Sequence, residues 1–167
     1  MKIKTNIIVS VLLALVVSSF IINYMRSEKS LNELLVKTEL TNINGIAVNK
    51  DELKGQVMIL AYFQTWCSDC AKEQPELLKL QEKFGSDKLK IMMISDEPLD
   101  KVIGFKAFFR SPLDFYISSK KLKSIGIQKF PTTYLIDKEG KIRDMKVEGI
   151  HWYTPETIAT IEQLLAQ

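Results

Sequence analysis

The only two cysteines of this 167-residue chain, Cys67 and Cys70, lie in the segment 66–70, which has the sequence WCSDC. The segment follows the apolar run 57–63, so we expect a buried strand to end just before a helix that begins at the cysteines. At a helix start, the helix dipole and free N–H groups lower the pKa of the first thiol and favour its reactive thiolate. The pair can also close into a disulfide. The sequence therefore predicts a dithiol redox site.

Two other interpretations of this spacing stay open. A static disulfide closes so small a ring that it constrains the unfolded chain very little. A single C-x-x-C pair is also half of a common zinc site. The expected position between strand and helix favours a redox role over an inert disulfide.

The elements around the cysteines follow from apolar periodicity and turn residues. After Cys70, apolar residues at helical spacing lead to Gly85, a typical helix stop. A second helix opens at 96–98, and we expect its buried stripe to consist of Val102, Phe105, Phe108 and Phe109. A basic helical turn is expected at 119–125 and a last helix from 154 onward. Strands are expected at 57–63, 89–95, 115–117, 132–136 and 142–147.

A β-hairpin is predicted ahead of these elements, over residues 40–48 around the turn dipeptide Asn44-Gly45. The predicted order is then a hairpin, a βαβαβ unit and a ββα unit. This order indicates an α/β fold with a mixed central sheet and helices on both faces.

The N-terminus predicts a membrane anchor. Lys2 and Lys4 precede the 21 uncharged residues 5–25, which as a helix would be about 31 Å long, close to the thickness of the hydrocarbon core. We interpret 1–26 as an uncleaved signal anchor. The alternative is a cleaved signal peptide, with residues 17–19 as a poor cleavage site inside an apolar run that continues beyond them.

Residues 27–37 are polar and predict a linker between the anchor and a domain at 38–167. An N-terminal anchor with a lysine-bearing start usually places the rest of the chain outside the cytoplasm, where disulfides persist. The net charge of +3 comes from mixed charges with no basic patch, which disfavours nucleic-acid binding.

Three segments resemble the membrane-anchored, thioredoxin-like TlpA/ResA group of thiol-disulfide oxidoreductases, within the AhpC/TSA and redoxin-like superfamily. They are FQTWCSDCAKEQPEL, FPTTYLIDKEGKI and the hairpin with Leu53-Lys54-Gly55. The resemblance covers residues 38–167 and implies a thioredoxin fold with an extra N-terminal β-hairpin. It also implies that Cys67 attacks a partner's disulfide and that Cys70 resolves the mixed disulfide.

The same resemblance marks two further residues. Pro131 is similar to the family's cis-proline, which lies opposite the dithiol, although an ordinary trans proline is the alternative. Glu73, three residues after Cys70, matches a glutamate that affects proton transfer at the cysteines. The alternative is a surface glutamate favoured by the helix dipole. Ala61 stands where thioredoxins often carry a buried aspartate, so a proton relay must lie elsewhere.

The surroundings of the cysteines complete the predicted site. We expect Trp66, Phe130 and Thr132 to form a rim that receives substrate, with the aromatic rings shielding the sulfurs. Asp69 adds a negative charge beside the thiolate, which should disfavour it and make the couple more reducing.

His151, the only histidine, leaves open a copper-binding metallochaperone that uses both cysteines. A relative with that function has cysteines one residue further apart, which disfavours it here. The threonine and proline that surround a peroxidatic cysteine are missing around Cys67, so a peroxidase is disfavoured too.

The sequence therefore predicts an extracytoplasmic disulfide reductase that is anchored by one span in the cell inner membrane. Its domain would face the periplasm and act as a monomer, with no cofactor beyond the dithiol. Its partners would be a membrane electron donor and a protein disulfide, and the resemblance makes apocytochrome c a candidate.

Overall fold

The computed structural model describes residues 34–35 and 38–167. The predicted anchor at 1–26 lies outside these residues, as does the predicted linker apart from Leu34 and Leu35. Within the described part of the chain, none of the helices has the length and apolar character that a membrane crossing requires.

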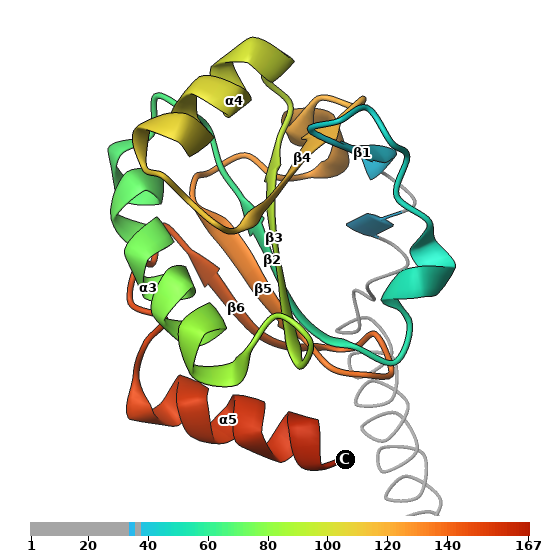
Figure 1. Cartoon of the computed structure of the whole chain (residues 1–167), viewed down its shortest axis with the longest axis vertical. Helices are drawn as coiled ribbons and strands as arrows, with labels where there is room; N and C mark the ends of the chain where they lie inside the picture. Colours follow the sequence, from blue (N-terminus) through green and yellow to red (C-terminus); the bar gives the residue numbers. More distant parts are fainter. Residues whose placement is uncertain (1–33, 36–37) are drawn as a thin grey trace, which may run out of the picture.

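A mixed six-stranded sheet forms the centre of the domain, in the order β1-β4-β3-β2-β5-β6 (Figure 1). The central strand β2 runs parallel to β3 and antiparallel to β5. β3 and β4 are parallel, whereas the edge strands β1 and β6 are antiparallel to their neighbours. The strands are β1 (Leu40–Asn42), β2 (Val57–Tyr62), β3 (Leu89–Ser95), β4 (Asp114–Ser118), β5 (Thr132–Ile136) and β6 (Ile142–Val147).

Helices separate successive strands except β5 and β6, which follow each other as the sequence predicts. They are η1 (Lys50–Leu53), α3 (Ser68–Phe84), α4 (Leu99–Phe108), η2 (Leu122–Ile125) and α5 (Pro155–Ala166), where η marks a 3₁₀ helix. α3 is the next element after β2, and it ends at Gly85, whose φ of 83° suits a residue without a Cβ atom. Thr154 caps α5 by accepting a hydrogen bond from the Thr157 N–H.

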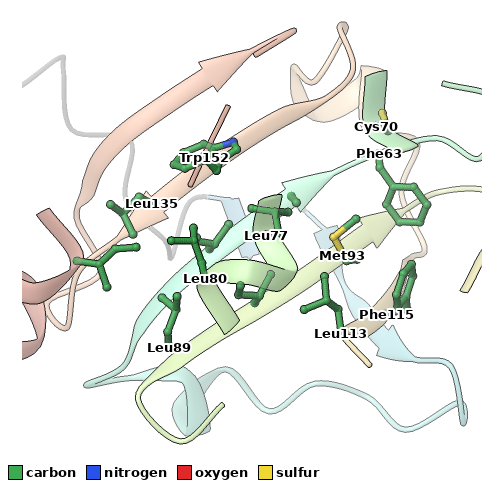
Figure 2. Packing of buried hydrophobic residues seen from close by; sticks show 14 of the residues in the cluster. Phe63, Cys70, Leu77, Leu80, Leu89, Met93, Leu113, Phe115, Leu135 and Trp152 are labelled. Atoms are coloured by element: carbon green, nitrogen blue, oxygen red, sulfur yellow. The ribbon is translucent and has the colours of Figure 1, made fainter. Parts of the chain in front are cut away.

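Every residue of β2 is buried, because alternate side chains enter two separate cores. One core receives Val57, Ile59 and Ala61 together with side chains from α3, α4 and α5, including Leu77 and Leu80 in Figure 2. The continuous apolar run 57–63 is thus explained by burial on both faces.

The three long helices share one face of the sheet, since all of them contribute to the same core. The other face is covered by Leu53 of η1, Leu122 of η2, and Leu34 and Leu35. Helices therefore cover both faces of the sheet as expected, but α3, α4 and α5 all lie on the same face.

The N-terminal hairpin forms with only one full strand. β1 pairs with β4, and the returning arm makes a single antiparallel bridge between Thr41 and Ala47. The side-chain oxygen of Asn42 accepts hydrogen bonds from the N–H groups of Asn44 and Ile46 and so stabilises the turn.

Phe108 is not part of the buried stripe of α4, contrary to our expectation. Val102 and Phe105 are buried, whereas Phe108 is 81% exposed. At about 100° per residue, position 109 returns to the face of position 102, while position 108 lies about 120° away from it. The aromatic run at 108–109 therefore places one ring inward and the other in solvent.

Candidate active site

The two cysteines lie where β2 gives way to α3, and a disulfide joins them. Cys67 is the N-cap residue of α3, and its Sγ accepts a hydrogen bond of 3.1 Å from the Cys70 N–H. Cys67 is 8% exposed, while Cys70, one turn further, is fully buried. The first sulfur is therefore the one that a partner can reach, and the Cys70 N–H that donates to it has no partner within the helix.

A buried carboxylate holds the loop before the cysteines. Glu97, just after β3, accepts hydrogen bonds from the N–H of Thr65 at 2.5 Å and from its hydroxyl at 2.9 Å. Its own N–H donates to the Ser95 hydroxyl. The sequence pattern at 96–98 predicts only a helix opening and gives no sign of this role, because the two partners are 32 residues apart.

Glu73 is fully buried on α3, one turn after Cys70. Its Oε1 accepts hydrogen bonds from the Thr133 hydroxyl at 2.7 Å and from the Trp152 indole N–H at 2.9 Å. Its Oε2 is buried without a hydrogen-bond partner among the described residues. Glu73 is thus not the surface glutamate that the alternative interpretation assumed.

Burial raises the pKa of Glu73 to about 7 because it penalises the charged form. The hydrogen bonds from Thr133 and Trp152, and the positive charge of Lys146, oppose this rise in pKa without cancelling it. The carboxyl group therefore titrates near neutral pH, where an acid or base that exchanges protons with thiols is useful.

The Phe130-Pro131 peptide bond is cis, as the resemblance implies. Pro131 immediately precedes β5, whose Thr132 pairs with Tyr62 at the end of β2. This register brings Pro131 to the end of the sheet from which the cysteine segment departs. The Pro131 carbonyl accepts a hydrogen bond of 2.7 Å from the Glu148 N–H.

The three predicted rim residues differ in their exposure. Trp66 is 72% exposed, and its ring meets that of half-buried Phe130 edge to face at 6.1 Å between centroids. Thr132 is buried, and its hydroxyl donates to the Lys129 carbonyl. Trp66 and Phe130 thus form an exposed aromatic ridge, while Thr132 lies beneath the surface.

Trp66 lines two hollows. The larger, of about 380 Å³, is lined on the described chain by residues of the cysteine segment and of α4, among them Cys67, Phe105 and Phe108. The smaller, of about 260 Å³, is lined by Phe130 and by residues around η2. Cys67 borders only the larger hollow.

The structure does not bring His151 into a metal site. His151 is exposed, and its carbonyl accepts a hydrogen bond from Lys146. Among residues 34–35 and 38–167, no three His, Cys, Asp or Glu side chains gather closely enough to hold a metal ion. The metallochaperone alternative thus gains no support from the described geometry.

Comparison with known sequences agrees with the geometry of the dithiol. Residues 32–145 match the model of the AhpC/TSA family. The thiol-disulfide oxidoreductase ResA of Bacillus thuringiensis is 30% identical over 108 residues, which cover 62% of this chain and 61% of that protein. The thioredoxin-like protein YneN of Bacillus subtilis is 27% identical over 113 residues, which cover 65% of this chain and 66% of that protein. These matches span just under two thirds of the relatives' length.

Solved structures give the same fold. A candidate protein disulfide isomerase from Bacteroides thetaiotaomicron superposes with a TM-score of 0.64 at 25% identity, covering 77% of this chain and 85% of that one. A thioredoxin-like protein from Porphyromonas gingivalis gives a TM-score of 0.62 at 19% identity, covering 78% and 90%. The domain is therefore thioredoxin-like.

Proposed function

Since this chain belongs to the AhpC/TSA family, we propose that it is a thiol-disulfide oxidoreductase that reduces disulfides in other proteins through Cys67 and Cys70. The observation that carries this proposal is the unequal pair of sulfurs, one at the N-cap of α3 on a residue that is 8% exposed and one on a fully buried residue a turn deeper. The names of the ResA relatives, which are thiol-disulfide oxidoreductases, support it.

The proposed reaction has two exchange steps. The Cys67 thiolate attacks one sulfur of the substrate disulfide, a mixed disulfide forms, and the other substrate sulfur leaves as a thiolate that takes up a proton. The Cys70 thiolate then attacks Cys67 Sγ, which closes the Cys67–Cys70 disulfide and releases the second substrate thiol. The substrate gains two electrons, and the dithiol loses them.

Glu73 and Pro131 have supporting roles in this reaction. Cys70 must lose its proton before it attacks, and Glu73 lies one turn away on α3 with a pKa of about 7. Glu73 accordingly exchanges protons with the buried thiol as a general acid and base. Pro131 presents backbone to the substrate beside the dithiol, and Trp66 and Phe130 contact the substrate at the rim.

The site of action in this proposal is the extracytoplasmic side of the cell inner membrane. The uncharged residues 5–25 support a single signal anchor, which would place the domain in the periplasm as a monomer. There a membrane electron donor would re-reduce the dithiol, with no bound cofactor. Apocytochrome c remains a candidate substrate, suggested by the TlpA/ResA resemblance alone.

Trapping the mixed disulfide tests the proposed function. The full-length Cys70→Ser variant, reduced and then mixed with oxidised insulin, should accumulate a covalent adduct through Cys67 because the resolving thiol is gone. The Cys67→Ser variant is the matched control and should form no adduct in the same time. Equal trapping by both variants would contradict the assigned order of attack, and no trapping with slow wild-type reduction of insulin would contradict the function.

A further inference from the structure

The larger hollow beside Trp66 is bounded on its far side by one face of α4. Its α4 residues are Lys101, the adjacent pair Gly104 and Phe105 three and four positions later, and Phe108 one further turn along, which is the spacing of one helical face. We call this hollow the Trp66–α4 groove. Because Cys67 borders it and not the smaller hollow, a substrate sulfur that reaches Cys67 brings its neighbouring residues to this groove.

Phe108 stands at the edge of the groove on a row of aromatic rings that runs from half-buried Phe109 to the core. Its ring lies 4.9 Å from that of Phe109, which lies 4.8 Å from Phe105, which in turn lies 5.1 Å from the fully buried Phe63. These edge-to-face and tilted contacts support the Phe108 ring, which is 81% exposed. An exposed but preorganised aromatic ring is typical of a contact that contributes strongly to binding, since little side-chain freedom is lost there.

The lining of the groove defines what it fits. Aromatic rings from Trp66, Phe105, Phe108 and Phe109 dominate it, and Lys101 is the sole charged side chain among its described residues. Its volume of about 380 Å³ compares with about 150 Å³ for a cavity that accepts benzene. The space is enough for one large apolar side chain together with part of its backbone.

We propose that the Trp66–α4 groove selects protein disulfides in which an aromatic or large aliphatic side chain lies one or two residues from the attacked cysteine. That side chain enters the groove against Phe108, and an acidic side chain of the same segment faces Lys101. This inference rests on the proposed reductase function and names the class of substrate that the function prefers. Consecutive Cα atoms are 3.8 Å apart, so the neighbours of a cysteine bound to Cys67 reach the groove without a bend in the chain.

Gly104 offers a way to close the groove without touching the cysteines. A Cβ atom built on Gly104 meets nothing within 4 Å, so a larger side chain at this position extends into open space. Leucine also favours a helix more than glycine does, so Gly104→Leu should not weaken α4. Ile103 is 44% exposed on the same helix and does not line the groove, which makes Ile103→Ala the matched control.

The test compares three oxidised substrates with the reduced full-length protein in detergent. Two are synthetic peptide disulfides that differ only in phenylalanine or glycine beside the attacked cysteine, and the third is hydroxyethyl disulfide. The wild type and Ile103→Ala should reduce the phenylalanine peptide about tenfold faster than the glycine peptide. Gly104→Leu and Phe108→Ala should lose most of that preference and keep their rate with hydroxyethyl disulfide.

The charge preference is tested with the same peptides. An aspartate beside the phenylalanine should raise the rate over a lysine there, and Lys101→Glu should reverse the order. Equal wild-type rates for the phenylalanine and glycine peptides, with hydroxyethyl disulfide still reduced, would overturn the groove proposal alone. Failure to reduce any of the three disulfides would overturn the reductase function and the groove proposal with it.

Discussion

Two buried carboxylates, Glu73 on α3 and Glu97 just after β3, are bonded differently. Both oxygens of Glu97 are engaged by Thr65, which fixes the loop that leads to Cys67. Glu73 has both of its hydrogen bonds on one oxygen, and the other oxygen is buried without a partner among the described residues.

This difference indicates that Glu97 positions a loop, whereas Glu73 can exchange a proton. A carboxylate with both oxygens bonded to one loop residue positions that loop, and its removal should appear mainly in stability. A buried carboxylate with a free oxygen is poorly compensated for its charge, so it takes up a proton near neutral pH. The stability of the protein should therefore depend on the hydrogen bonds of Glu97, and it should depend on pH through Glu73.

The largest effect is expected from Glu97→Ala. Two hydrogen bonds to a charged group disappear and the Thr65 N–H is left without its partner, so the free energy of unfolding should fall by about 4 kcal/mol. Denaturant unfolding of the oxidised protein measures this. Exposed Glu139→Ala is the control and should change it by less than about 0.5 kcal/mol. Similar losses for both variants would show that Glu97 does not hold the loop.

The next effect is the pH dependence of stability due to Glu73. Its pKa is raised from 4.5 to about 7 in the folded state, so the folded protein keeps a proton that the unfolded chain loses. The stabilisation is complete below pH 4.5 and is lost as the pH rises to 7, a change of about 3 kcal/mol at about 1.4 kcal/mol per pKa unit.

Glu73→Gln should remove that pH-dependent part, because an amide does not titrate. Denaturant unfolding of wild type and Glu73→Gln at a series of pH values between 4 and 8 measures the difference between them. Parallel curves for the two proteins would mean that the pKa of Glu73 is not raised by folding.

A smaller effect is expected from Thr133→Val. It removes one of the two donors to Glu73 Oε1, should cost about 1 kcal/mol in stability, and should raise the pKa of Glu73 further because this hydrogen bond favours the charged form. Thr132→Val is the control, since its hydroxyl donates to the Lys129 carbonyl instead. The titration of Glu73 by NMR should shift upward in the first variant only, and a shift in both would show that the hydroxyl of Thr133 is not its cause.

The smallest effect is expected from Asp69→Asn. Asp69 makes an exposed ion pair of 2.8 Å with Lys72, so its charge is largely offset before it acts on Cys67. Stability should change by less than about 0.5 kcal/mol, and the pKa of the Cys67 thiol, followed by thiolate absorbance, should fall only slightly. A large fall would restore the stronger role that the sequence suggested for Asp69.

Local patterns were sufficient to predict most of the fold and the dithiol. Strands β5 and β6 have the predicted bounds, and the cysteines stand between β2 and α3 as expected. Periodicity and turn residues act over a few positions, so they locate these elements well.

The surroundings of Glu73 could not be predicted in the same way. Its partners Thr133 and Trp152 are 60 and 79 residues away in the chain, and they meet it only because β5 returns beside β2. The prediction that Phe108 is buried was wrong for a different reason, because two adjacent phenylalanines cannot both lie on one helical face.

The reduction potential of the Cys67/Cys70 couple in the full-length protein distinguishes a reductase from an oxidant. Equilibration with thiol-disulfide buffers of known potential, followed through the fluorescence of the adjacent Trp66, gives this value. The proposed reductase predicts a potential near or below about −250 mV, in the range of thioredoxin. A value near about −120 mV, as in strongly oxidising members of this fold, would contradict it and make the protein a donor of disulfides.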